Sequence, residues 1–226
     1  MTTGTRARDP LTTGSRADPR ERRPRFWGWR SVVLALLVAG LLSGVLRAAV
    51  VDVYWIGSDS MRPTVEPGDR VLVSKLVEPS DLEHGDLVVF DGRGSFAPLH
   101  DDAPWPERLL RTVGGWGGLA GSDSVYLKRV VGLPGDTVHC CGPSGRLVVG
   151  GEEIVEDYVL PGDRPSELEF TAVVPDGRLW LMGDHRSVSV DSRSLLGAPG
   201  GGMVRADKVI GEPVAVLWPL DRAGQL

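Results

Sequence analysis

Cysteine and histidine are both scarce in this chain of 226 residues, and their placement excludes several kinds of site. The two cysteines, Cys140 and Cys141, are adjacent, so they form neither a spaced metal framework nor an ordinary disulfide between strands. A disulfide between neighbours and two free thiols both stay open. The four histidines lack metal-ligand spacing and no HExxH motif is present, so we expect no catalytic metal and no cofactor.

Positive charge is scarce in the later part of the chain. Residues 51–226 carry 16 Lys and Arg against 27 Asp and Glu, whereas residues 1–30 carry eight Arg against three acidic residues. Nucleic-acid binding needs clustered cations, so an acidic body of this kind excludes nucleic acid as a partner. The basic start suits the anionic face of a membrane instead.

Long apolar runs are also absent, apart from one segment near the start. Residues 1–25 contain almost no large apolar side chain, and we expect a disordered cytoplasmic tail there. Residues 26–55 then predict a transmembrane anchor, because a helix from Val32 to Trp55 would extend roughly 35 Å. A signal peptide or a buried core helix is the alternative. The positive-inside bias places everything after Trp55 outside the cytoplasm.

Thirty glycines, 17 prolines and many valines favour a mainly β body with frequent turns. An exposed, flexible insertion is expected over residues 91–124. We predict a last strand over 209–218, broken by Pro213. The other predicted strands lie at residues 71–73, 87–90, 125–131, 147–149, 155–160, 168–174 and 179–182.

The stretch GSDSMRPTVEPGDRVLVSK, residues 57–75, follows the apolar segment directly. Two prolines and a Gly-Asp turn make it stiffer than a linker. A serine held on such a rigid loop, Ser60, is a candidate nucleophile.

Lysine occurs only three times, which limits the search for a base. Strand alternation places Lys128 between Tyr126 and Val130 on one face. Burial among apolar neighbours lowers a lysine pKa, so a neutral amine could accept a proton from a serine near neutral pH. Lys75 also alternates with valines, and the pattern alone does not separate the two.

The segment GDHRSVSVDSR, residues 183–193, is densely polar and follows an apolar strand. A solvated loop is one interpretation. Alternatively, its side chains converge on a site, and Asp191 would then pair with Arg129 on the back of the Lys128 strand. A Ser-His-Asp triad with His185 also stays open.

Four blocks of the sequence resemble type I signal peptidases, the membrane-bound serine proteases that remove signal peptides from exported proteins. The blocks stand in the family's order, and KRVVGLPGD is the most specific of them. They cover residues 58–69, 85–90, 128–136 and 183–193.

The resemblance implies Ser60 as nucleophile and Lys128 as general base. It also implies the Ser60 amide and the Ser58 hydroxyl as oxyanion donors, and Ser189 as the serine that orients the lysine. Supporting polar residues implied by the resemblance are Asp184, Arg186, Asp191, Arg193 and Arg129. Residues that resemble the lining of the substrate pocket are Tyr54, Ile56, Met61, Tyr126 and Leu127.

The family's architecture implies an antiparallel-sheet catalytic body over residues 56–226, with a small second β subdomain at about 137–180, preceded by one transmembrane helix. His185 departs from the family, since many bacterial members carry Asn there. The implied partners are exported preproteins, cut after small residues of the Ala-x-Ala type, together with the lipid bilayer and the export machinery. The implied location is the plasma membrane, in a single pass.

Two other functions are open. A self-cleaving Ser/Lys protease of the repressor type shares the serine and the lysine but usually carries a DNA-binding module. A membrane-tethered scaffold with relic catalytic residues would retain the fold without the activity.

Overall fold

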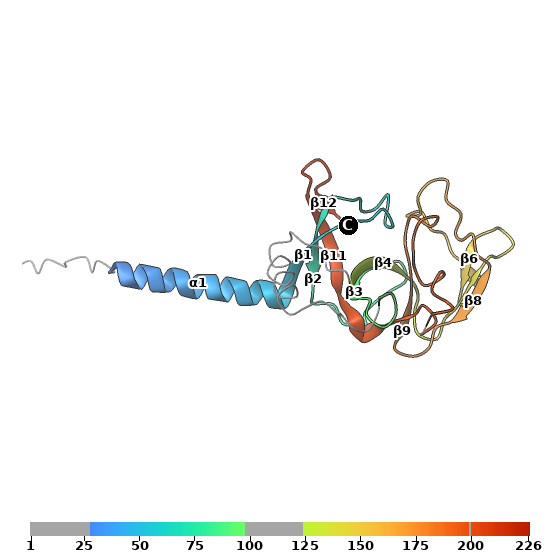
Figure 1. Ribbon diagram of the computed structural model, residues 1–226, viewed down its shortest axis with the longest axis horizontal. Helices are drawn as coiled ribbons and strands as arrows, with labels where there is room; N and C mark the ends of the chain where they lie inside the picture. Colours follow the sequence, from blue (N-terminus) through green and yellow to red (C-terminus); the bar gives the residue numbers. More distant parts are fainter. Residues whose placement is uncertain (1–27, 98–123, 199) are drawn as a thin grey trace, which may run out of the picture. The chain divides into compact units, whose positions relative to one another are not determined.

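A computed structural model describes residues 28–97, 124–198 and 200–226 (Figure 1). The predicted tail at 1–25 and most of the predicted insertion at 91–124 lie outside these residues. The chain divides into two compact units, Met1–Leu41 and Leu42–Leu226.

Helix α1, Trp29–Val50, consists mainly of Leu, Ala and Val, and many of its large side chains are exposed. Within the described part of the chain, no helix is both long enough and apolar enough to cross a membrane. The prediction of one helix through residue 55 is wrong, because Val51–Trp55 forms strand β1. β1 pairs with β2 along its whole length, and this pairing outweighs the apolar continuity with the helix.

The larger sheet contains eight strands, and seven of them follow the order β1-β2-β11-β3-β4-β9-β10, with β12 paired to β11. Every strand pair in it is antiparallel. A short 3-10 helix, Ala206–Lys208, leads into β11. The remaining bounds are β2 Arg70–Ser74, β3 Leu87–Asp91, β4 Val125–Gly132, β9 Arg178–Met182, β10 Val204–Arg205, β11 Val209–Trp218 and β12 Gly224–Gln225.

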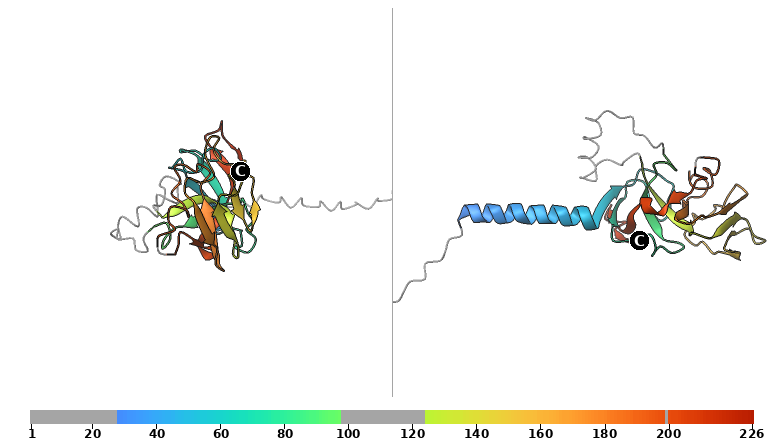
Figure 2. Two further views of the ribbon diagram at one scale, coloured as in Figure 1. Left: turned by 90° about the vertical axis from the view of Figure 1, so that its right-hand side faces the viewer. Right: turned by 90° about the horizontal axis from the view of Figure 1, so that it is seen from below.

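A smaller antiparallel sheet has the order β7-β6-β5-β8. Its strands are β5 Thr137–Cys140, β6 Leu147–Val149, β7 Glu152–Glu153 and β8 Phe170–Val173. This smaller sheet lies on one side of β9, and β2 and β11 lie on the other side (Figures 1 and 2). Its inner side chains share one core with Trp180 of β9, whose indole stacks on Phe170 at 5.2 Å between ring centroids. The two sheets are therefore joined through β4 and β9.

Most strand predictions are confirmed, and two are wrong. Residues 155–160 form no strand but a turn in which the Val159 amide donates to the Glu156 carbonyl at 3.2 Å. Pro213 does not break β11, because a register shift between Pro213 and Ala215 accommodates its missing N–H. The adjacent Cys140 and Cys141 are joined by a disulfide.

Candidate active site

The loop that carries Ser60 is closed at its base by backbone hydrogen bonds. Ile56 donates its amide to the Asp69 carbonyl at 2.9 Å, and the Gly68 amide donates to the Ile56 carbonyl at 2.8 Å. Gly68 has a φ of +98°, a conformation that side chains disfavour. The buried carboxylate of Asp69 accepts the Glu66 amide and the guanidinium of Arg222. These contacts make the loop rigid, as its sequence predicts.

Ser60 and Lys128 meet although 68 residues separate them. The Lys128 Nζ atom lies 2.6 Å from Ser60 Oγ, a hydrogen-bond distance. Ser58 Oγ lies 3.1 Å from the same oxygen. Lys75, the other lysine that the sequence left open, instead pairs with Asp52, with 3.1 Å between Nζ and Oδ2.

Lys128 is 4% exposed, and this burial has an electrostatic consequence. Burial disfavours the ammonium ion and lowers the pKa of Lys128 to about 8, while the nearby carboxylates of Asp191 and Asp184 act in the opposite direction. A substantial fraction of neutral amine therefore exists just above neutral pH. Such an amine can take the proton of the serine hydroxyl that it contacts.

The predicted pairing of Arg129 with Asp191 is wrong. Arg129 binds Asp184 through two hydrogen bonds, from Nε to Oδ1 at 2.8 Å and from Nη2 to Oδ2 at 2.6 Å. Asp184 also accepts the Thr64 hydroxyl at 2.5 Å. Because Thr64 follows Ser60 by four residues, the Arg129–Asp184 pair is attached directly to the serine loop.

Asp191 has closer partners of its own. Its Oδ2 accepts the Gly183 amide at 3.0 Å and the Arg193 guanidinium at 2.7 Å. An arginine two residues away reaches this carboxylate more easily than Arg129 does from another strand. Arg186 pairs with Glu156, so each buried arginine here has its own carboxylate.

Gly183 allows the serine loop to approach closely. A Cβ at this position would lie 2.4 Å from the Ser60 carbonyl oxygen and 2.2 Å from Ser189 Oγ. Ser189 is thus in the neighbourhood that the sequence predicts, and its buried hydroxyl has no hydrogen-bond partner within the described residues. An unsatisfied hydroxyl at this place leaves one donor and acceptor available to the site.

His185 contacts the serine loop through its backbone and its ring. Its amide donates to the Ser60 carbonyl at 3.1 Å, and Nδ1 lies 3.2 Å from the Asp59 carbonyl oxygen. Ser60 Oγ is contacted by Lys128 instead, so the geometry does not favour the Ser-His-Asp triad.

Four of the five predicted pocket residues share one apolar cluster. Met61 and Leu127 are buried there, and Tyr54 and Ile56 are half-buried against it. Tyr126 belongs to another cluster, where it packs on Phe90 at 5.8 Å between ring centroids. Among the described residues, no group of three or more His, Cys, Asp or Glu could hold a metal ion.

Sequence reasoning missed Thr64, Glu156 and Tyr158. Thr64 lies inside the SMRPT motif, so its closeness to Ser60 was a usable signal. The Tyr158 ring lies 4.1 Å from the Arg129 Cζ atom, and its hydroxyl donates to Glu156 at 2.8 Å. No local pattern marks either of these two residues, since the surrounding sequence alternates like a strand.

Asp184→Asn is expected to lower the free energy of unfolding by about 3 kcal/mol or more, because it leaves a buried Arg129 without its carboxylate. Urea unfolding followed by circular dichroism measures this loss. The control is Asp59→Asn, which removes an exposed pair with Arg62 and should cost at most about 1 kcal/mol. Equal losses in the two variants would show that the buried pair contributes no more than the exposed one.

The family model described as "Signal peptidase, peptidase S26" matches residues 29–218. A probable signal peptidase I of Mycobacterium leprae is 32% identical over 235 residues, which cover 90% of this chain and 81% of that protein. Probable signal peptidase I-1 of a Synechocystis species is 34% identical over 195 residues, covering 84% of this chain and 83% of that protein.

A solved structure of a signal peptidase I from Enterococcus faecalis has a TM-score of 0.37 and 24% identity, covering 58% of this chain and 96% of that chain. This likeness is too low to add to the assignment. The family match spans most of the chain, and both sequence relatives align over most of their own length. The chain therefore belongs to the signal peptidase family, peptidase S26.

Proposed function

We propose that the chain is a serine endopeptidase that removes signal peptides from exported preproteins, with Ser60 as nucleophile and Lys128 as general base. The observation that carries the proposal is the 2.6 Å contact between Lys128 Nζ and Ser60 Oγ, made by a buried lysine. Family membership supports the substrate class, because the matched family is described by that activity.

The proposed reaction begins when the neutral Lys128 amine takes the proton of Ser60 Oγ as that oxygen attacks the scissile carbonyl carbon. The Ser60 amide and the Ser58 hydroxyl are the proposed donors to the resulting oxyanion, a kind of interaction worth about 3 to 4 kcal/mol per donor. The protonated lysine then gives its proton to the leaving amine, which departs as the new N-terminus. Water, deprotonated by Lys128, hydrolyses the acyl-enzyme and releases the signal peptide.

The edge of β4 supports strand pairing by the substrate. Pairing between β4 and β9 begins at Arg129, whereas Val125–Lys128 pairs with β3 alone among the described strands. An extended peptide can add to such an edge, with its backbone beside Lys128. The proposed pocket residues are Tyr54, Ile56, Met61, Tyr126 and Leu127, and the small residues of an Ala-x-Ala site would suit a shallow pocket.

Attachment to a membrane belongs to the same proposal. Its support is the run of exposed apolar side chains on α1, among them Leu34, Leu37 and Leu41 at 62 to 69% exposure. The eight arginines in residues 1–30 favour a cytoplasmic start and an extracytoplasmic catalytic body. The single pass predicted from the sequence stays a prediction, as does contact with the export machinery.

The two rival functions are less well supported. A relic scaffold gains nothing from a lysine buried beside a serine, because burial of an amine costs free energy of folding. A self-cleaving repressor-type protease is not the family that matches this chain.

Ser60→Ala and Lys128→Ala should each abolish cleavage, because one removes the nucleophile and the other the base. The purified full-length protein is mixed with a preprotein that carries an Ala-x-Ala site, and cleavage is scored by the new N-terminus. Lys75→Ala is the matched control and should keep activity within about threefold, since Lys75 pairs with Asp52 away from Ser60. Full activity of either dyad variant would refute the assignment.

Activity should fall as the pH drops through about 8, the lowered pKa of Lys128. Only the neutral amine accepts a proton, and its fraction decreases about tenfold per pH unit below the pKa. Measurement of kcat/KM from pH 6 to 10 should therefore give an acid limb with a slope near one. Lys75→Ala should leave that limb in place, and a flat profile over this range would contradict a lysine base.

Replacement of Leu34, Leu37 and Leu41 by serine should move the protein from the membrane pellet to the supernatant after alkaline extraction. The reason is the loss of apolar surface available to lipid. The control replaces Val155, Leu168 and Val173, which are exposed at 53 to 63% on the body, and should leave the protein in the pellet. Release of both variants to the same extent would argue against attachment through α1.

A further inference from the structure

The segment between β7 and β8 crosses the polar loop that follows β9. We call residues 154–165 the brace segment. The Leu160 amide donates to the Asp184 carbonyl at 3.0 Å, and the Ser187 amide donates to Asp163 Oδ2 at 3.0 Å. The brace segment is therefore fixed at two points to residues 184–187, which flank the site.

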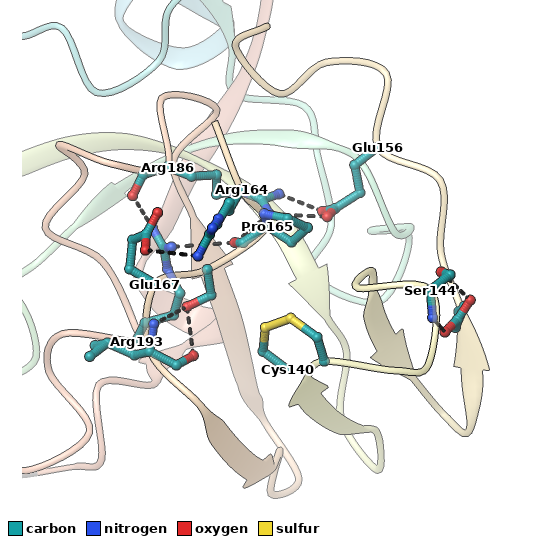
Figure 3. The surroundings of a disulfide bond; sticks show 12 residues. Cys140, Ser144, Glu156, Arg164, Pro165, Glu167, Arg186 and Arg193 are labelled. Atoms are coloured by element: carbon teal, nitrogen blue, oxygen red, sulfur yellow. Dashed lines mark hydrogen bonds and ion pairs between the residues drawn. A yellow bond between two sulfur atoms is a disulfide. The ribbon is translucent and has the colours of Figure 1, made fainter. Parts of the chain in front are cut away.

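A buried ion pair strengthens this attachment. Arg186 donates from Nη1 to Glu156 Oε2 at 3.0 Å and from Nη2 to Glu156 Oε1, and the two side chains are 1% and 6% exposed. Arg186 also donates to the carbonyl of Pro165, at the other end of the brace segment, at 3.0 Å (Figure 3). A buried pair is stable only when its remaining hydrogen-bonding groups are satisfied, and these contacts satisfy them.

Glu156 in turn contacts Tyr158. The tyrosine hydroxyl donates to Glu156 Oε1 at 2.8 Å. Its ring lies 4.1 Å from Arg129 Cζ and 6.0 Å from Arg186 Cζ, measured to the ring centroid. The aromatic ring thus interacts with two guanidinium groups, one of which belongs to the site.

Arg129 uses its in-plane donors elsewhere, which leaves its face for the ring. Nε and Nη2 donate to Asp184, and Nη1 donates to the Gly85 carbonyl at 2.6 Å. Tyr158 covers this guanidinium and excludes water from one side of it. The attraction within a charge-assisted pair is stronger where water is excluded, so the Arg129–Asp184 geometry is held more firmly.

The Arg129–Asp184 pair holds the serine loop through Thr64. Thr64 Oγ1 donates to Asp184 Oδ2 at 2.5 Å and lies 3.3 Å from Arg129 Nη2. Ser60 and Thr64 belong to one rigid loop, so a shift of Asp184 displaces Ser60 relative to Lys128. Displacements of about 1 Å far from the chemistry can lower a rate by about 100-fold.

We propose that Tyr158 is a positioning residue: its ring covers Arg129 and thereby holds the Asp184–Thr64 contact that fixes Ser60 against Lys128. This proposal rests on the proposed function, in which Ser60 is the nucleophile. The ring, not the hydroxyl, performs the role, since the ring contacts Arg129.

The test compares Tyr158→Phe with Tyr158→Leu in the full-length protein, with the Ala-x-Ala preprotein as substrate. Tyr158→Phe keeps the ring and should keep kcat within about threefold. Tyr158→Leu should lower kcat by about tenfold or more and leave KM within about twofold, because it moves the nucleophile and not the substrate. The folded fraction of each variant, from urea unfolding, normalises kcat.

Phe170→Leu is the matched control, since it removes a stacked ring from the small-sheet core. It should lower stability but leave kcat per folded molecule unchanged. The proposal is overturned if Tyr158→Leu has a wild-type kcat, if Phe170→Leu shows the same loss, or if Tyr158→Phe loses as much as Tyr158→Leu.

Hydrogen exchange separates this proposal from the proposed function. Tyr158→Leu should speed amide exchange in residues 60–65 by about tenfold or more, whereas Phe170→Leu should not. If the wild-type protein does not cleave the preprotein, the proposed function fails, and the exchange rates still decide whether Tyr158 holds the loop. Unchanged exchange in that loop would overturn the positioning role by itself.

Discussion

The site depends on one constraint, the removal of water from the Lys128 amine. In water a lysine is protonated at neutral pH and cannot accept a proton. Here the β4 strand holds Lys128 inside the body, and burial lowers its pKa to about 8. The hydroxyl of Ser60 supplies the contact that a buried amine requires. The rest of the structure has to keep these two groups together and keep water out.

The charges close to the Lys128 amine affect how much of it is neutral. Asp184 and Asp191 are fully buried near Lys128, and both favour its protonated form. Each of them is bound by its own arginine, Arg129 and Arg193. Burial outweighs the two carboxylates, so the pKa of Lys128 stays lowered, and the charge of Arg193 lowers it further. The same pairs anchor the loops, which joins the electrostatics of the site to its geometry.

Much of the fold could be predicted because its strands are rich in valine and follow turns marked by glycine, proline or aspartate. The four motif blocks implied Ser60 and Lys128 as the reacting pair, whereas strand pattern alone left Lys75 and Lys128 equivalent. They differ only in three dimensions, where Lys75 reaches Asp52 and Lys128 reaches Ser60. The partner of Arg129 was missed because Asp191 is held by Arg193 and Gly183, contacts that a strand pattern does not show. Strand β1 was missed because its apolar residues continue the helix pattern. Its strand conformation depends on pairing with β2, which is distant from the helix pattern in the sequence.

The place of β11 in the larger sheet has a consequence for biosynthesis. This strand spans residues 209–218 and lies between β2 and β3, which are not neighbours of each other. During translation, the β1–β2 hairpin and the β3–β4 pair emerge early and must wait, with open edges, for the strand that unites them. Until it arrives, the halves that carry the serine and the lysine have no shared sheet. The sheet that joins these two halves can therefore close only after β11 has been synthesised, so the serine loop and the lysine strand come together late in folding.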